Sequence, residues 1–386
     1  MPYGRQDITA EDIAAVVEVL GSDRLTQGPG VPEFEKSVAR YCGARHAVAV
    51  NSATSALHLA CLALGVGPGD VVWTTPITFV ASANCALYCG AGIDFVDIDP
   101  RTGNLCPEAL ARKLEHAEKS GTLPKVIIPV HLCGQSCDMK AIHALAKRYG
   151  FHIIEDASHA IGGRYRGGPI GCCLYSDITV FSFHPVKIIT TGEGGMAVAN
   201  DSGLARKMAR LRSHGITRDP AEMEGPPVGP WYYEQRDLGF NYRMTDLQAA
   251  LGISQLGRLD RYIARRQELA RRYDRLLADL PVQPLWQHPD CRSSWHLYVI
   301  RLRAEELRVS HRQVFVNLRR KGIGIQLHYI PVYRQPYFQR MGFAPGQFPE
   351  AERYYRQAIT LPIFPLLADD QQDLIVELLA RELDRP

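Results

Sequence analysis

The chain has 386 residues, a length that predicts two or three domains at about 150 residues each. Its hydrophobic fraction of 46% and charged fraction of 22% are those of a globular protein with a sizeable core, which excludes a disordered chain. The net charge of +3 is too small to indicate nucleic acid or an anionic membrane as the main partner. Arg5 and Asp7 interrupt the N-terminal segment, and no uncharged apolar stretch approaches the roughly 20 residues that span a bilayer. We therefore expect a cytoplasmic protein with no secretory signal and no membrane partner.

Ten cysteines are spread along the chain without any C-x-x-C motif. Cys85 and Cys89 form a C-x₃-C pair, as do Cys133 and Cys137, and His131 lies close to the second pair. In a large chain without a signal peptide, free thiols in a reducing cytosol are the main interpretation. A zinc site is the alternative, and we predict no metal.

The N-terminal half alternates two kinds of pattern. Thr9 and Asp12 have the spacing of a capping box, which predicts a helix through Leu20. Seven apolar runs follow as far as about residue 215, separated by helical patterns such as SALHLACLAL and MKAIHALAKRYG. The runs are HAVAV (46–50), DVVWTT (70–75), GIDFVDI (92–98), KVIIPV (125–130), FHIIED (151–156), DITVFSF (177–183) and GMAVAN (195–200). This alternation predicts an α/β fold with a mainly parallel, seven-stranded sheet covered by helices on both faces.

The C-terminal half has a different organisation. Residues 219–231 are rich in Pro and Gly and predict a loop. Residues 245–280 form a long helical stretch, in which basic and acidic residues alternate. This mixture of charges favours a solvent-exposed helix face over a nucleic-acid-binding surface. The runs WHLYVIRL and IGIQLHYI then predict strands, and HRQVFVNLRRKG and QQDLIVELLARELD predict helices. We predict a large domain over 1–245, long connecting helices over 246–280 and a small C-terminal α+β domain over 281–386.

Three points that follow predicted strands could carry chemistry, because ligands of open α/β sheets gather beyond the carboxyl ends of the strands. Residues 51–55 (NSATS) precede an apolar helix and predict either a phosphate cup or simple helix caps. Asp156 ends the FHIIED run, where a buried carboxylate needs a partner, either a core arginine or a protonated ring nitrogen. His159 follows three residues later and could equally be a core histidine.

Lys187 follows the next strand, before a glycine-rich segment (GEGG). A lysine in an apolar site has a lowered pKa and can form Schiff bases, whereas a surface lysine before a turn is the simpler interpretation. The lysine precedes its glycines, unlike that of a nucleotide triphosphatase loop. Taken together, a phosphate cup, a strand-end aspartate and, 31 residues later, a strand-end lysine are the parts of a pyridoxal 5′-phosphate (PLP) site.

The sequence resembles the DegT/DnrJ/EryC1/StrS family of sugar aminotransferases, which are PLP-dependent transferases of fold type I. The resemblance runs from about residue 3 to residue 380. The matching segments are RLTQGPGVPEFE, NSATSALHLA, TTPITFVASANCAL, IIEDASHAIGG, SFHPVKIITTGEGG, GFNYRMTDLQAALG and QLHYIPVY.

Within that family the chain is similar to enzymes that aminate C4 of a UDP-4-keto-6-deoxy-N-acetyl-hexosamine, above all those of the pseudaminic acid pathway. Ala53 in NSATSAL and the LTQG, SFHPVK and LHYIPVY segments carry this placement. The implied substrate is UDP-2-acetamido-2,6-dideoxy-β-L-arabino-hex-4-ulose. A D-configured UDP-4-keto-6-deoxy-GlcNAc or another nucleotide keto sugar is the alternative, and the 219–231 loop could shape this choice.

The resemblance implies roles for particular residues. Lys187 would be the Schiff-base lysine and proton shuttle, Asp156 would pair with the pyridine nitrogen, and pyridoxamine phosphate (PMP) would be the intermediate. His159 would lie beside the 3-hydroxyl group and Phe79 would stack on the ring. The phosphate would be held by Ala53, Thr54 and Ser182, and by Asn241 of a neighbouring subunit, which implies a homodimer with composite sites. The implied contacts to the nucleotide sugar are Tyr3, Asp23, Arg24, Leu25, Thr26, Arg243, Gln326, His328 and Tyr329.

Three hypotheses follow for the function. The first is a transaminase that takes its amino group from L-glutamate. The second is a sugar dehydratase of the same family that uses PMP, which is disfavoured because those relatives carry His where this chain has Lys187. The third is a non-catalytic regulator that retains the fold, which is disfavoured because the lysine, the aspartate and the phosphate cup are all present.

Overall fold

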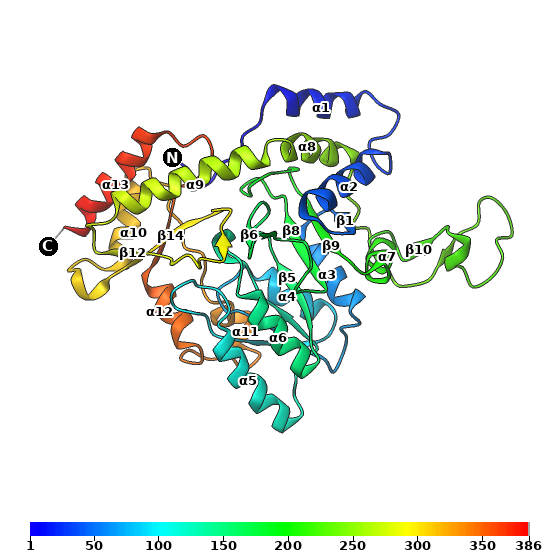
Figure 1. The fold of residues 1–386 in the computed structure, drawn as a ribbon, viewed down its shortest axis with the longest axis horizontal. Coiled ribbons are helices and arrows are strands. Elements are labelled where there is room, and N and C mark those ends of the chain that lie inside the picture. The colour runs from blue at the N-terminus through cyan, green and yellow to red at the C-terminus, as the bar shows by residue number, and fades with distance from the viewer. Residues whose placement is uncertain (385–386) are drawn as a thin grey trace.

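The computed structural model describes residues 1–384 and is built around a seven-stranded sheet (Figure 1). The strands lie in the order β1-β9-β8-β5-β4-β2-β3; β9 is antiparallel to both of its neighbours, whereas the pairs from β8 to β3 are parallel. They are β1 (His46–Val50), β2 (Val71–Thr74), β3 (Gly92–Phe95), β4 (Val126–Ile128), β5 (His152–Asp156), β8 (Ile178–Ser182) and β9 (Gly195–Ala199). Each of the seven apolar runs supplies one strand, so the prediction of a mainly parallel α/β sheet is confirmed.

Helices cover both faces of this sheet. One face packs against α3 (Ala53–Ala63), α4 (Ala81–Tyr88) and α7 (Ser202–Leu211), and the other against α2 (Gly30–Cys42), α5 (Pro107–Ser120), α6 (Met139–Tyr149) and α8 (Asp246–Leu256). Neighbouring strand residues therefore enter different cores: Ile154 packs with the first group of helices and Ile153 with the second. This double burial is the reason that the strands read as continuous apolar runs.

Helix α1 (Ala10–Leu20) lies along α8 at the edge of the molecule (Figure 1). It begins at the expected capping box, in which the Thr9 amide donates to Asp12 at 2.9 Å. Asp12 is buried and also accepts hydrogen bonds from Gln255 at 2.8 Å and from Arg258 at 2.5 Å. One carboxylate thus fixes the start of α1 and joins it to the α8–α9 region.

A second, smaller assembly lies at the C-terminal side of the chain. The long helix α9 (Leu259–Leu276) packs against the large core through its first half, and through its second half against a three-stranded antiparallel sheet. The assembly contains β12 (Val282–Pro284), β14 (Tyr298–Leu302), β15 (Ala358–Leu361), α10 (His311–Arg320) and α13 (Asp369–Leu383). The domain limits proposed from the sequence stay a prediction, and residues 385 and 386 lie outside the described residues.

The predicted strand IGIQLHYI is wrong. Residues 323–330 contact this sheet through a single bridge from Gln326 to Thr360, and AITL (β15) occupies the sheet position instead. Gly324 binds the N-terminal segment, with its amide donating to the Met1 carbonyl at 2.6 Å, and a Cβ there would lie 2.4 Å from the same oxygen. The segment is therefore held beside the chain start, and its His328 and Tyr329 reach the central cavity.

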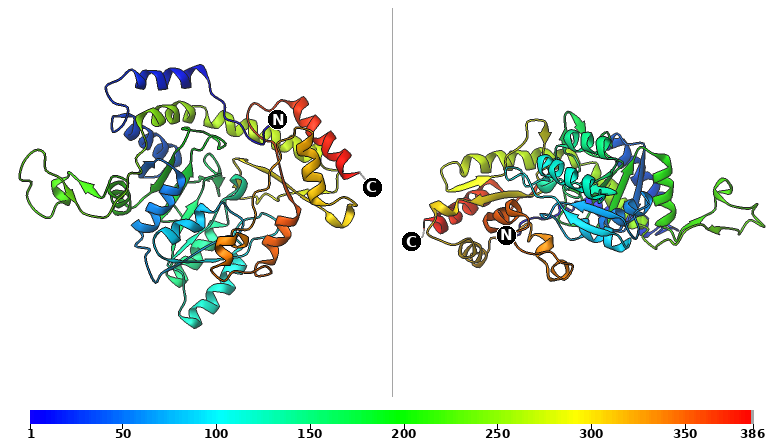
Figure 2. Two further views of the ribbon diagram at one scale, coloured as in Figure 1. Left: turned by 180° about the vertical axis from the view of Figure 1, so that it is seen from behind. Right: turned by 90° about the horizontal axis from the view of Figure 1, so that it is seen from below.

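The predicted loop at 219–231 forms the end of a projecting arm. It lies between β10 (Ile216–Thr217) and β11 (Glu234–Gln235), begins with a short 3₁₀ helix (Pro220–Glu222), and extends away from the body (Figure 2). Val228, Trp231 and Tyr233 are largely exposed on it.

The remaining elements are β6 (Arg164–Tyr165), β7 (Gly168–Pro169), β13 (Cys291–Arg292), α11 (Pro336–Gln339), α12 (Pro349–Gln357) and 3₁₀ turns at Leu132–Gly134, Ala304–Glu306 and Val332–Arg334. Within residues 1–384, no helix is both long and apolar enough to cross a bilayer.

The buried carboxylate of Asp12 generates a stability prediction. Asp12→Ala leaves the Thr9 amide, Gln255 and Arg258 without their acceptor, so we expect the free energy of unfolding in urea to fall by about 2–3 kcal/mol. Glu18→Ala on the same helix removes an exposed carboxylate and should change it by less than about 0.5 kcal/mol. Equal losses in the two variants would show that Asp12 does not anchor α1.

Candidate active site

A cavity of about 780 Å³ opens at the carboxyl ends of β1, β5 and β8. The parallel arrangement of these strands makes their ends meet at one edge of the sheet, as expected for a ligand site in an α/β fold. Ten residues predicted from the sequence line it: Tyr3, Ala53, Thr54, Phe79, Asp156, His159, Ser182, Lys187, His328 and Tyr329. The structure therefore brings together residues that are more than 300 positions apart in the chain.

Lys187 lies on a turn after β8, where its amide donates to the His184 carbonyl at 2.9 Å. Burial lowers the pKa of this lysine from its ordinary 10.5 to about 8, while the nearby carboxylate of Asp156 acts in the opposite direction. A substantial fraction of the side chain is consequently an uncharged amine near neutral pH. This is the state in which a lysine is a nucleophile.

Asp156 ends β5 and is held on both carboxylate oxygens. Oδ1 accepts from the Ser158 amide at 3.1 Å, and Oδ2 accepts from the Ser82 hydroxyl at 2.6 Å. The Ser82 hydroxyl lies 2.8 Å from that of Thr78, and all three of these side chains are buried. These bonds fix the direction of the carboxylate and give the buried group hydrogen-bond partners.

Sequence reasoning missed Ser82. It lies in TTPITFVASANCAL, three residues after Phe79, and is the second residue of α4. A serine in the first turn of a helix is a common residue there and gives no specific signal.

The start of α3 supplies an anion site. Ser52 caps the helix by accepting from the Ser55 amide at 3.1 Å, and Asn51 accepts from the Ser55 hydroxyl at 2.7 Å. Ala53 and Thr54 are the first two residues of the helix, and amides at these positions have no partner within a helix. They line the cavity, so the capping and phosphate-cup interpretations of NSATS are compatible.

The last glycine of the GEGG segment, Gly195, occupies a position where a side chain would not fit. It begins β9 and pairs with Val50 and Ser182, the last residues of β1 and β8. A Cβ at this position would lie 2.5 Å from the backbone nitrogen of Ala53 and 2.5 Å from the carbonyl carbon of Ser52. A side chain here would therefore displace the start of α3.

Three buried histidines form one wall of the cavity. His159 lies with its ring centroid 4.4 Å from that of His296, and its Nε2 lies 3.2 Å from the Tyr329 hydroxyl. His328 bonds Thr360 through Nδ1 at 2.9 Å. Burial, with Lys187 adding to it, lowers the pKa of His328 to about 3 and the pKa of His159 far below its ordinary range. The wall is therefore uncharged at neutral pH.

His296 is a site residue that sequence reasoning missed. It lies in WHLYVIRL two residues before β14, and a histidine beside an apolar strand gives no specific signal. Its Nδ1 and that of His159 are buried and lack a hydrogen-bond partner within the described chain. Both histidines line the cavity, and a buried polar atom of this kind normally has a hydrogen-bond partner.

The other predicted contacts lie outside this cavity within the single chain. Asn241 is exposed and bridges to Ser213, and Arg243 donates to the Ser213 hydroxyl at 3.0 Å. Residues 23–26 are exposed, and Gln326 pairs with Thr360. Their proposed roles in ligand binding stay predictions.

The cysteines show no metal-binding arrangement. Within residues 1–384, no group of three or more His, Cys, Asp or Glu side chains is placed to hold a metal ion. All ten cysteines are free thiols. His131, the residue that suggested a zinc site, lies 2.7 Å from Glu155 through Nε2 and accepts from the Cys137 amide through Nδ1 at 3.2 Å.

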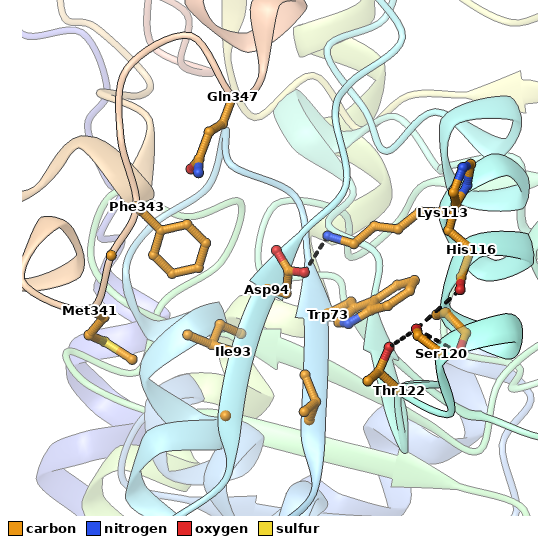
Figure 3. Close-up of a pocket in the computed structure, with 14 residues that line it drawn as sticks. Trp73, Ile93, Asp94, Lys113, His116, Ser120, Thr122, Met341, Phe343 and Gln347 are labelled. Atoms are coloured by element: carbon orange, nitrogen blue, oxygen red, sulfur yellow. Dashed lines mark hydrogen bonds and ion pairs between the residues drawn. The ribbon is translucent and has the colours of Figure 1, made fainter.

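A second pocket, of about 560 Å³, lies beside β2, β3 and α5 (Figure 3). Its main charged group is Lys113, which bonds Asp94 at 2.5 Å and the Phe95 carbonyl at 2.6 Å and lies over the Trp73 ring. The charges in this pocket thus satisfy one another, and none of the predicted site residues lines it. We place the chemistry in the larger cavity.

Comparison with known proteins identifies the family. The DegT/DnrJ/EryC1/StrS aminotransferase family matches residues 6–380. The chain belongs to this family. It is therefore a sugar aminotransferase, a PLP-dependent transferase, as the resemblance of its motifs implied.

Similar proteins cover nearly the whole chain. The spore coat polysaccharide biosynthesis protein SpsC of Bacillus subtilis is 42% identical over 98% of this chain and 95% of its own. PseC of Helicobacter pylori, an aminotransferase involved in the biosynthesis of pseudoaminic acid, is 33% identical, with a TM-score of 0.89 over 99% of this chain and 98% of PseC. Spr1654 of Streptococcus pneumoniae in its PMP form is 31% identical, with a TM-score of 0.89 over 100% of this chain and 99% of that one.

The residues of this aminotransferase fit PLP. The cofactor requires an anion site for its phosphate, a carboxylate for its ring nitrogen and an amine for its aldehyde. The start of α3, Asp156 and Lys187 present these three groups to one cavity. The unpartnered Nδ1 of His159 is a further polar atom that a cofactor could satisfy.

The position of Gly195 generates a binding prediction. We expect Gly195→Ala to displace Ser52 and Ala53, at a cost of about 1–3 kcal/mol, and to raise the Kd of PLP roughly 10- to 100-fold. Gly67→Ala is the matched control, because nothing lies within 4 Å of a Cβ there. Retention of full affinity by Gly195→Ala, measured by fluorescence titration, would show that the cofactor phosphate binds elsewhere.

The lowered pKa of Lys187 generates a pH prediction for the cofactor-free enzyme. Its amine should be half deprotonated near pH 8, where a lysine of pKa 10.5 would be only about 0.3% deprotonated. Competitive acetylation followed by peptide mapping should show reactivity at Lys187 rising with pH around a midpoint near 8. Asp156 raises this pKa, so Asp156→Asn should move the midpoint lower. A midpoint of 10 or above would contradict the desolvated site.

Proposed function

We propose that this aminotransferase moves an amino group from L-glutamate to C4 of a UDP-4-keto-6-deoxy-N-acetyl-hexosamine. The proposed substrate is UDP-2-acetamido-2,6-dideoxy-β-L-arabino-hex-4-ulose, an intermediate of pseudaminic acid biosynthesis. The observation that carries the reaction is the convergence of Lys187, Asp156 and the start of α3 on one cavity. The similarity to PseC over almost the full length of both chains supports the sugar.

A second sugar remains a candidate because of a specific observation. SpsC, which is 42% identical, takes part in the biosynthesis of a spore coat polysaccharide. A D-configured UDP-4-keto-6-deoxy-GlcNAc or another nucleotide keto sugar would require the same lysine, aspartate and anion site. These three groups therefore do not distinguish the two sugars.

When bound, PLP supplies an electron sink that makes the exchange of an amino group between two substrates possible. Lys187 is proposed to bind the cofactor and, as a free amine, to take up and return the transferred proton at its Nζ. Asp156 is proposed to hold a proton on the ring nitrogen, because its carboxylate is fixed in direction by hydrogen bonds from Ser82 and Ser158.

Other residues are proposed to position the reactants. Ala53, Thr54 and Ser182 are proposed to surround the cofactor phosphate. His159 is proposed to face the cofactor ring, and the Tyr329 hydroxyl is hydrogen-bonded to His159. The Phe79 side chain is 59% exposed although it lines the cavity, so a stacked ring would cover apolar surface that is otherwise open to water. The buried histidines of the cavity wall are proposed to limit the access of water to the reacting groups.

We also infer that the site is completed by a second copy of the chain. Asn241 and Arg243 carry the motif GFNYR, yet neither lines the cavity of its own chain. The projecting arm next to them exposes Val228, Trp231 and Tyr233, an apolar group that is unusual on a solvated arm. A homodimer that covers the arm and presents Asn241 to the partner's phosphate site accounts for both features.

A direct assay tests the proposal. The enzyme is incubated with L-glutamate and, separately, with each C5 epimer of the UDP-4-keto-6-deoxy-N-acetyl-hexosamine, and the product is identified by NMR. We expect amine at C4, with the L-arabino epimer converted at least about tenfold faster, and little transfer when L-glutamine replaces L-glutamate. Lys187→Ala should lose at least about 10³-fold in kcat, whereas Lys36→Ala, at an exposed position, should not.

The outcomes separate the sugar from the reaction. Faster conversion of the D-configured epimer would reject the proposed sugar and retain the transaminase. Release of keto product without amine would favour a dehydratase, and full turnover by Lys187→Ala would reject the proposed mechanism.

A further inference from the structure

Residues 293–296 (SSWH) lead from β13 towards β14 and pass beside the active-site cavity. The last of them, His296, lines that cavity. Apart from limiting the access of water, the proposed function gives His296 no task. The segment nevertheless contacts one residue of the proposed cofactor site, His159, at two separate points.

The first contact is to the backbone of His159, whose carbonyl accepts a hydrogen bond from the Ser294 hydroxyl at 2.7 Å. The Ser294 amide also donates to the Gly134 carbonyl at 3.1 Å, and a Cβ at Gly134 would clash with the Ser294 hydroxyl. The second contact is between rings, because the centroids of His296 and His159 lie 4.4 Å apart. One short segment therefore holds both the backbone and the ring of His159.

Packing and not hydrogen bonding holds the imidazole of His296. Within residues 1–384 this ring makes no hydrogen bond, and its Nδ1 is buried. Burial lowers the pKa of His296 far below its ordinary range, with the charge of Lys187 adding to the effect, so the ring is uncharged at neutral pH. A ring without hydrogen bonds takes its position from its own backbone and from the groups packed against it.

Arg266 on α9 fixes that backbone. Its side chain is 1% exposed, and its Nη1 donates to the carbonyls of Trp295 at 3.0 Å and of His296 at 3.3 Å. The same nitrogen donates at 3.0 Å to the carbonyl of Ile363, whose amide donates to the Tyr3 carbonyl at 3.0 Å. A guanidinium is costly to bury, and the acceptors of this one are backbone groups next to cavity residues.

The turn at Trp295 needs this support. Its φ of 51° lies in the left-handed region, which bulky side chains rarely adopt. Its amide donates to the Ser293 hydroxyl at 3.0 Å, and its carbonyl accepts from Arg266, so hydrogen bonds hold the residue on both sides. If this turn relaxed, His296 would move relative to Ser294, and the two contacts to His159 could not be kept together.

We propose that His296 is a positioning residue of this aminotransferase, which fixes the ring of His159 in the active site, and that Arg266 holds His296 in the position where it does so. The inference rests on the proposed function, in which His159 faces the cofactor ring. The ring of His159 has two supports, namely the ring of His296 and the hydroxyl of Tyr329, which lies 3.2 Å from its Nε2. Without His296 only the second support remains, and the ring of His159 is free to turn away from the cofactor.

A matched pair of substitutions tests the role of His296. His296→Ala removes the packed ring, whereas His296→Phe keeps a planar ring without nitrogen atoms. We expect His296→Ala to lower kcat at least about tenfold, to change the KM for L-glutamate by less than about threefold, and to move the pH midpoint of the visible band of bound PLP by at least about 0.5. His296→Phe should keep kcat within about threefold of the wild type and leave the midpoint unchanged, as should His116→Ala at an exposed position.

The outcomes separate this inference from the proposed function. A wild-type enzyme that forms no visible band with PLP would reject both. A normal band, with kcat and midpoint unchanged in His296→Ala, would overturn the inference and leave the proposed function intact. Equal losses in His296→Phe and His296→Ala would also overturn it, because the ring nitrogens and not the packing would then matter.

Hydrogen exchange of the cofactor-free enzyme tests the role of Arg266. In Arg266→Met, peptides that cover residues 293–298 should exchange at least about fivefold faster, whereas Arg271→Met, at an exposed position of the same helix, should leave them unchanged. Arg266→Lys keeps a buried donor and provides the same test if Arg266→Met does not fold, with exchange at least about twofold faster. It should also move the midpoint of bound PLP in the same direction as His296→Ala. Unchanged exchange in a folded Arg266 variant would contradict its role.

Discussion

A desolvated amine held near a buried carboxylate is the interaction on which the structure of this enzyme depends. Lys187 loses part of its charge because it is buried, and Asp156 restores some of it. Asp156 in turn ends a buried strand with both of its carboxylate oxygens hydrogen-bonded, one to the hydroxyl of Ser82 and the other to the amide of Ser158. The amine and the carboxylate therefore face one cavity in fixed positions.

The sheet topology provides this arrangement. Because β5 and β8 are parallel neighbours, their carboxyl ends lie side by side, and residues that follow them are close without being adjacent in sequence. The antiparallel β9 begins at the same edge, where Gly195 leaves room for the start of α3. The C-terminal part of the chain adds His296, His328 and Tyr329 to the cavity lining. Lys187, the start of α3 and these three residues thus come from three distant parts of the chain.

Much of this arrangement could be predicted from the sequence. Buried parallel strands must be apolar along their whole length, so each of the seven runs was visible, and Asp156 and Lys187 stood out as charges at the ends of such runs. Ser82 and His296 could not be found in this way, because a helix serine and a histidine beside a strand acquire meaning only from what they face. IGIQLHYI has the pattern of a strand, but pairing with the N-terminal segment, which local sequence does not encode, holds it elsewhere. The pairs β6–β7 and β10–β11 have two residues per strand, too few for any periodicity.

We propose that Lys187, and no other lysine, carries the cofactor beside Asp156. Reduction of the PLP-loaded enzyme with borohydride, followed by peptide mapping, tests this proposal directly. We expect the reduced cofactor to be attached at Lys187, and we expect no covalent label after loading of Lys187→Ala. Attachment at any other lysine of the wild-type enzyme, or an unlabelled Lys187 peptide, would contradict it.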